Sequence, residues 1–191
     1  MRSLLLLLAV ALGATRSTAD EPKKPNYFPL AKGNKWEYAV TLANKKKHTQ
    51  VVEVTDTKMK DGKLIVTVKG QSEYVYRVED SAVMELSTDD DIRDTPVPRL
   101  KFPLKKGEKW SLKEKADGVT IELTWAVGEP VEVKVPAGKF TAVPVIYTED
   151  VGGIKVTNTL HYVDGIGLVR REAVFFLGTV TEELTKFTPG K

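Results

Sequence analysis

The chain has 191 residues, of which 29 are Lys or Arg, 26 are Asp or Glu and none is Cys. The lack of cysteine excludes disulfide bonds, thiolate metal sites and a lipid-modified N-terminal cysteine. A net charge of +3 is too small to indicate a nucleic-acid-binding protein.

The first nineteen residues have the three parts of a secretory signal peptide. Arg2 provides a positive charge, residues 4–12 form a short apolar run, and residues 17–19 are the small residues that precede a cleavage site. The apolar run is about half the length that a membrane-spanning helix requires. We therefore expect cleavage between Ala19 and Asp20, and export of an unanchored protein that is periplasmic or secreted.

Cleavage would also change the charge and the start of the folded part. It removes Arg2 and Arg16 and lowers the net charge to +1, which further weakens the case for a nucleic-acid partner. Residues 20–26 contain two prolines and four charged residues, so we expect a flexible leader. A single β domain is expected at 27–191.

Alternation of apolar and polar residues recurs from Trp36 to the C-terminus, and no window has the spacing of an amphipathic helix. Strands with one dry and one wet face are typical of antiparallel sheets. The sequence therefore predicts an all-β fold of about a dozen antiparallel strands in a meander, forming a curved sheet, a half-barrel or a sandwich. The predicted strands are 36–42, 49–55, 63–69, 73–79, 82–87, 109–113, 120–127, 131–135, 140–149, 154–163, 168–175 and 179–187.

Most connections between these strands have the residues of hairpin turns. Gly138 and Gly165 are two of the positions expected to adopt positive φ. The segment 88–98 differs, because it holds four aspartates and two prolines. We expect it to be a loop between two groups of strands.

A nine-residue segment occurs twice in the chain. Residues 28–36 read FPLAKGNKW and residues 102–110 read FPLKKGEKW, with seven of nine positions identical. Gly33 and Gly107 are expected to supply positive-φ turns that lead into strands. We interpret the copies as marking two related halves, 27–87 and 99–187, with the aromatic residues packed in the core. The alternative is that Trp36, Trp110 and Trp125 contact an apolar ligand or a sugar.

Besides the repeated segment, the chain contains two further distinctive motifs, VPAGKF at 135–140 and YVDGIGLV at 162–169. In this combination the chain resembles a group of uncharacterised secreted bacterial proteins with F-P-L-x-x-G-x-x-W, V-P-A-G-x-F and Y-x-x-G-x-G-L-V segments. More distantly, it is similar to the half-barrel sheets of periplasmic lipoprotein carriers. That similarity implies a concave apolar face able to hold an acyl chain.

Few residues suit a metal site. His48 and His161 are the two histidines, and His161 is expected on the strand face opposite Leu160 and Tyr162. Aspartates 89–91 and Asp94 could offer oxygen ligands to Ca²⁺, but they lack the alternating spacing of an EF-hand loop. We expect no metal and no cofactor.

No nucleophile motif is present, since the chain lacks both cysteine and a G-x-S-x-G segment. Glu122 and Glu149 are examples of carboxylates that could serve glycoside hydrolysis if the fold brought such a pair together. Lysines 45–47 could contact an anionic polymer or lipid headgroups, or simply form a solvated hairpin tip.

The sequence thus favours a non-enzymatic β domain that binds an apolar small molecule or an envelope component, with a lipid or an envelope protein as partner. Two alternatives stay open. An extracytoplasmic interaction or structural module predicts an exposed apolar patch or an unpaired edge strand. A hydrolase predicts convergent carboxylates in a cleft.

Overall fold

The computed structural model describes residues 25–116 and 118–190, which form thirteen β-strands and no helix. The expected signal peptide and its cleavage site lie outside the described residues. The strands are β1 (Lys35–Thr41), β2 (Lys47–Lys60), β3 (Lys63–Lys69), β4 (Glu73–Glu79), β5 (Ala82–Thr88), β6 (Asp91–Lys101), β7 (Lys109–Ala116), β8 (Val119–Val127), β9 (Val131–Val135), β10 (Gly138–Val151), β11 (Ile154–Val163), β12 (Gly167–Phe175) and β13 (Gly178–Thr188).

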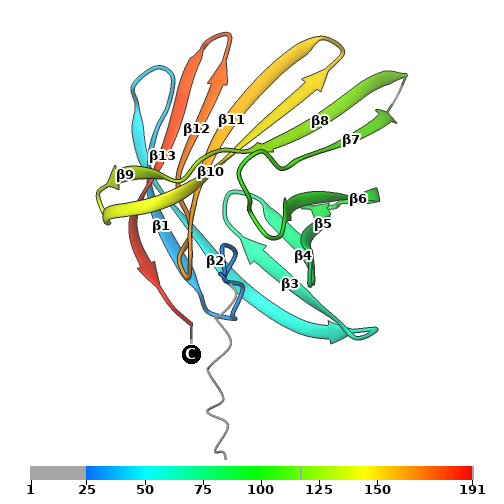
Figure 1. Cartoon of the computed structure of the whole chain (residues 1–191), viewed down its shortest axis with the longest axis horizontal. Helices are drawn as coiled ribbons and strands as arrows, with labels where there is room; N and C mark the ends of the chain where they lie inside the picture. Colours follow the sequence, from blue (N-terminus) through cyan, green and yellow to red (C-terminus); the bar gives the residue numbers. More distant parts are fainter. Residues whose placement is uncertain (1–24, 117, 191) are drawn as a thin grey trace, which may run out of the picture.

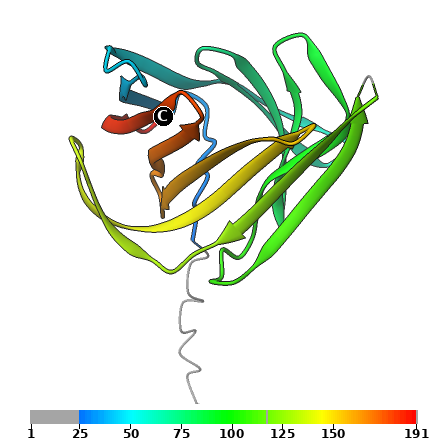
Figure 2. The same ribbon diagram turned by 90° about the horizontal axis from the view of Figure 1, so that it is seen from above.

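All the strands belong to one antiparallel sheet, in which twelve follow the order β6-β5-β4-β3-β2-β1-β13-β12-β11-β10-β8-β7 and β9 pairs with β10 beside this order. The first and last strands of the chain, β1 and β13, pair at the centre of this order. The sheet curls into a nearly closed barrel, which brings the edge strands β6 and β7 to the same side of the molecule (Figures 1 and 2).

The seam between the two edge strands is bridged by a side chain. The indole Nε1 of Trp110, in β7, donates a hydrogen bond of 2.9 Å to the carbonyl oxygen of Pro98, in β6. Residues 102–108 carry the chain from one edge to the other. This contact ties together two strands that end the order of the sheet.

The strand pairing places alternate side chains inside the barrel. In β1 the aromatic residues Trp36 and Tyr38 are buried together with Val40, whereas the residues between them are half-buried. The first part of β10 pairs with β9 and its second part with β8. Val133 and Val135 of β9 join the same hydrophobic core as Leu184 of β13.

The structure confirms the predicted all-β meander and its curved, barrel-like form. Each of the twelve predicted strands is present. Four of them match in full, and the others differ by one to five residues at one or both ends. The expectation of a loop at 88–98 is wrong, because Asp91–Lys101 forms β6 and pairs with β5. Pro96 and Pro98 are tolerated there because an edge strand leaves one row of backbone N–H groups without a partner strand.

Within the described ranges, the structure contains no helix with the length and hydropathy needed to cross a membrane.

Candidate functional site

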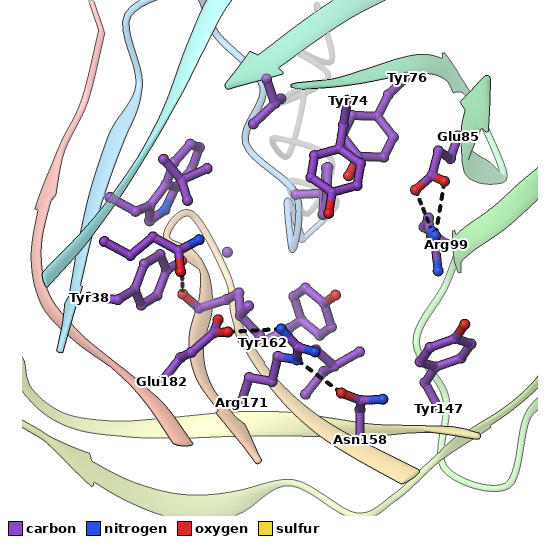
Figure 3. Close-up of a pocket in the computed structure, with 18 of the residues that line it drawn as sticks. Tyr38, Tyr74, Tyr76, Glu85, Arg99, Tyr147, Asn158, Tyr162, Arg171 and Glu182 are labelled. Atoms are coloured by element: carbon purple, nitrogen blue, oxygen red, sulfur yellow. Dashed lines mark hydrogen bonds and ion pairs between the residues drawn. The ribbon is translucent and has the colours of Figure 1, made fainter. Parts of the chain in front are cut away.

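The interior of the curled sheet holds a cavity of about 510 Å³. Its wall draws on strands from both sides of the β1–β13 pair, because the inward residues of each strand point toward the same interior (Figure 3). Five tyrosines contribute to this wall. They are Tyr38, Tyr74, Tyr76, Tyr147 and Tyr162.

Burial raises the pKa of four of these tyrosines, which are Tyr38, Tyr76, Tyr147 and Tyr162. Burial raises the pKa of Tyr162 above its ordinary value of 10.0, although the charges of Arg99 and Arg171 oppose the rise. Burial also raises the pKa of Tyr147 to about 12, against the opposing effect of Arg99. These four phenols therefore stay protonated at physiological pH, and each adds an apolar ring and a polar hydroxyl to the cavity.

A first charged cluster lies on the β5–β6 side of the cavity. Glu85 is fully buried, and its two carboxylate oxygens accept hydrogen bonds of 2.6 and 2.9 Å from Arg99. The hydroxyl of Thr88 donates a further hydrogen bond of 2.9 Å to Glu85. Although burial alone would lower the pKa of Arg99, its hydrogen bonds with Glu85 raise that pKa, so the guanidinium stays charged.

Arg99 also ends a column of aromatic rings that crosses the interior. Its guanidinium carbon lies 5.6 Å from the ring centroid of Tyr147. Tyr147 stacks on Trp125 with centroids 5.1 Å apart, and Trp125 stacks on Trp110 at 5.7 Å. The column therefore connects β6 with β10, β8 and β7, which lie on the other side of the seam.

A second charged cluster lies where β11, β12 and β13 adjoin. Arg171 donates hydrogen bonds of 2.9 Å to Asn158 Oδ1 and 2.8 Å to Glu182. The strand register explains this meeting, because Arg171 pairs directly with Glu182. All three side chains line the cavity (Figure 3), so this wall offers a fixed guanidinium, an amide and a carboxylate.

The three tryptophans singled out in the sequence are divided between different places. Trp36 and Trp125 line the cavity, whereas Trp110 lies behind Trp125, against the seam. Trp36 stacks on Phe187 and donates a hydrogen bond of 2.6 Å to the carbonyl oxygen of Ile166. The structure therefore does not bring Trp36 and Trp110 together as one clamp.

The four glycines expected in turns all have positive φ: Gly33 (83°), Gly107 (84°), Gly138 (145°) and Gly165 (72°). The first two, one from each copy of the nine-residue segment, also share a hydrogen-bonding pattern. Gly33 N donates to Val54 O at 2.8 Å, and Gly107 N donates to Val127 O at 2.9 Å. The copies thus form the same turn before β1 and before β7.

The residues considered for catalysis or metal binding do not converge. Glu149 lines the cavity, but Glu122 is exposed and opposes Asp150 on the outer face of the sheet. His48 is exposed, and His161 is half-buried on a strand face away from the cavity-lining Leu160. The described ranges contain no group of three or more His, Asp or Glu side chains able to hold a metal ion.

Sequence reasoning missed the residues that make the cavity polar. Glu85 and Arg99 lie between apolar neighbours and Arg171 lies between Arg170 and Glu172, and in each case a charged residue is expected to point outward. Met84 and Leu86 flank Glu85, so alternation alone would place them inside. In the structure Glu85 alternates with the buried Val83 and Ser87 instead, so the carboxylate points inward and Met84 and Leu86 lie on the other face.

Neither family models nor curated proteins match the sequence of this chain. Its fold, however, matches two solved structures. One is a candidate exported protein with a YmcC-like fold from Bacteroides fragilis, with a TM-score of 0.58, 16% identity and coverage of 86% of this chain and 100% of that chain. The other is a candidate lipoprotein from Parabacteroides distasonis, with a TM-score of 0.56, 13% identity and coverage of 87% and 100%. At these identities the likeness concerns the fold.

Proposed function

We propose that the protein is exported and that its β domain binds a small amphipathic molecule in the interior cavity, without transforming it. The observation that carries the proposal is the cavity of about 510 Å³ inside the curled sheet. Protein interiors are close-packed, and voids larger than a water molecule are few. A space of this size lies within the range typical of small-molecule sites.

The chemistry of the wall supports an amphipathic ligand rather than a purely apolar one. Aromatic rings and aliphatic residues such as Leu160 and Val68 can bury a hydrophobic part. Asn158, Arg171 and the tyrosine hydroxyls can orient a polar part. A fully apolar ligand would remove water from the donor and acceptor positions that these groups do not use with one another, which costs binding energy.

Binding without catalysis is supported by how the carboxylates of the cavity are engaged. Glu85 and Glu182 are each hydrogen-bonded to an arginine, and Glu149 accepts a hydrogen bond of 3.2 Å from Tyr147. Such fixed pairs suit recognition better than proton transfer. Glu122, the other carboxylate considered for hydrolysis, is on the outer face.

Export is supported by the features of residues 1–19. The two proteins of the same fold described above are themselves named as exported or as a lipoprotein. Expression of the full chain in a Gram-negative host tests this part. Mass spectrometry of the extracytoplasmic product should give a chain beginning at Asp20, and retention of the uncleaved chain in the cytoplasm would contradict export.

Blocking the cavity tests the binding part. Val156→Trp places an indole in the cavity wall, whereas Ile146→Trp places one on the outer face of β10, where Ile146 is 43% exposed. We expect the wild type and Ile146→Trp to bind the fluorescent probe N-phenyl-1-naphthylamine, and Val156→Trp to bind it at least about tenfold more weakly. Urea denaturation would show that both variants are folded. Equal binding by all three proteins, or no binding by the wild type, would contradict the proposal.

A further inference from the structure

One end of the molecule carries three hairpin turns side by side. They join β1 to β2, β10 to β11 and β12 to β13, and they lie at the end opposite the C-terminus (Figure 1). A Cβ atom added to Gly178, at the β12–β13 turn, would lie 3.1 Å from Ala43 Cβ in the β1–β2 turn. Thr157 pairs with Val174, so the same register places Ile154 and Leu177 at adjoining strand ends.

Large apolar side chains are exposed at this end. Phe176 is 89% exposed, Leu177 is 76% exposed and Ile154 is 68% exposed, and Val174 adds to them beside the turn. We call Ile154, Val174, Phe176 and Leu177 the apolar tip. Single exposed apolar residues are ordinary, but a group of them on adjoining turns marks a contact site.

A positive charge accompanies the apolar tip. Lys45, Lys46 and Lys47 are all exposed on the β1–β2 hairpin, whose Ala43 contacts the β12–β13 turn. No salt bridge joins these three lysines to an acidic residue in the part of the chain that the structure describes. Exposed aromatic and aliphatic residues beside unpaired lysines complement a bilayer interface, where acyl chains begin beneath anionic headgroups.

We infer that this end of the protein docks on a lipid bilayer that carries anionic headgroups. Phe176, Leu177 and Ile154 enter the interface between headgroups and acyl chains, and lysines 45–47 contact the headgroups. A bilayer suits this surface better than a protein partner does, because the surface combines exposed lysines with protruding apolar side chains. The inference is independent of what the cavity binds, although Phe175, next to Phe176, lines the cavity.

The chain offers a matched control at the β2–β3 turn. Met59 is 67% exposed and lies between two exposed lysines, Lys58 and Lys60, away from the apolar tip. Figure 1 shows this turn at the end of the molecule opposite the β12–β13 turn. Changes of the same kind at this site remove similar chemistry without touching the proposed contact.

Flotation with lipid vesicles tests the inference, using residues 20–191, which contain every described strand. The wild type should float with vesicles of phosphatidylcholine and phosphatidylglycerol, and less with phosphatidylcholine alone. Phe176→Ser with Leu177→Ser should weaken binding to the anionic vesicles about tenfold. Lys45→Glu with Lys46→Glu should also weaken it at least about tenfold, with little change on neutral vesicles.

The controls Met59→Ser and Lys58→Glu with Lys60→Glu should bind as the wild type does. Circular dichroism melts would confirm that all the proteins are folded. Failure of the wild type to bind anionic vesicles at low salt would overturn the inference, and so would equal losses in the tip and control variants. Neither result would bear on probe binding in the cavity, so the two proposals fail separately.

Discussion

The two arginine–carboxylate clusters of the cavity use the same chemistry in different surroundings. Glu85 is fully buried and receives two hydrogen bonds from Arg99, which in turn lies against the aromatic column that spans the seam. Arg171 and Glu182 lie on adjacent central strands, and their side chains are 36% and 12% exposed. The strands of both clusters are joined by backbone pairing, and the first cluster differs in that Arg99 also contacts Tyr147 across the seam.

This difference separates a structural role from a binding role. The Glu85–Arg99 cluster and its column stabilise two edges that lack ladder hydrogen bonds to each other, so loss of the cluster should open the seam. The Arg171–Glu182 cluster lies within the paired central strands and makes no contact of this kind across the seam. Its charged groups are therefore available to recognise a ligand.

Removal of the Glu85 charge should give the largest effect. Glu85→Gln leaves the Arg99 guanidinium, whose side chain is 26% exposed, without the charge of its partner, which we expect to destabilise the fold by about 2–3 kcal/mol. Glu53→Gln is the control, since Glu53 and Lys35 form a surface pair at 2.7 Å whose loss should cost less than about 1 kcal/mol. Urea denaturation measures the free energy of unfolding of both variants. Equal losses of stability would contradict a structural role for the Glu85–Arg99 pair.

Weakening of the seam itself should have an intermediate effect. Trp110→Phe removes the hydrogen bond to Pro98 O and part of the ring stack, which should cost about 1–2 kcal/mol. Hydrogen exchange should accelerate in β6 and β7 more than in β1 and β13. The same substitution in the other copy, Trp36→Phe, also removes one indole hydrogen bond but should leave exchange at the seam unchanged. Uniform acceleration across the sheet in both variants would contradict a specific role at the seam.

Removal of Arg171 should affect binding more than folding. Arg171→Met loses hydrogen bonds to Asn158 and Glu182, and we expect a stability loss of about 1 kcal/mol because the pair is partly exposed. Affinity for dodecanoate, a carboxylate amphiphile, should fall about tenfold with the loss of a charged donor, whereas affinity for N-phenyl-1-naphthylamine should change little. Displacement titrations separate the two probes. A stability loss as large as that of Glu85→Gln, with both probe affinities unchanged, would indicate a structural role for Arg171 rather than a binding role.

The smallest expected effect comes from the outer face of β11. Burial, aided by the charge of Arg170, lowers the pKa of His161 below its ordinary 6.5, while Glu172 opposes the shift. The unfolded chain then binds the proton more readily, so this contribution to stability is present above pH 6.5 and is lost as the pH falls below it. His161→Gln should flatten the pH dependence of the unfolding free energy between about pH 5 and 7. Identical slopes for the two proteins would exclude the His161 ring as the cause.

Local alternation was sufficient to predict most of the fold. The strand at residues 154–163 matches β11 in full, because most of its inward residues are apolar and its ends are turns. The strand β6 was not predictable in this way. Its aspartates and prolines are residues of loops, and they are compatible with a strand only because β6 lies at an edge.

The candidate site was predictable only in part. Trp36 and Trp125 were identified as aromatic candidates and line the cavity, but the separation of Trp110 from Trp36 depends on the curl of the whole sheet. Arg171, Asn158 and Glu182 come from three strands, and their meeting depends on register, which alternation does not specify. Glu85 lies in phase with the buried Val83 and Ser87, but Met84 and Leu86 beside it are apolar, so hydrophobicity alone favours the opposite strand face.

The most direct test of cavity binding locates the bound molecule. Amide chemical shifts of isotope-labelled residues 20–191 can be recorded while N-phenyl-1-naphthylamine is added. We expect the largest changes at cavity-lining positions such as Asn158, Tyr162 and Arg171, with little change at Phe176 and Leu177. Changes confined to the apolar tip, or no changes at saturating probe, would contradict a binding site inside the sheet.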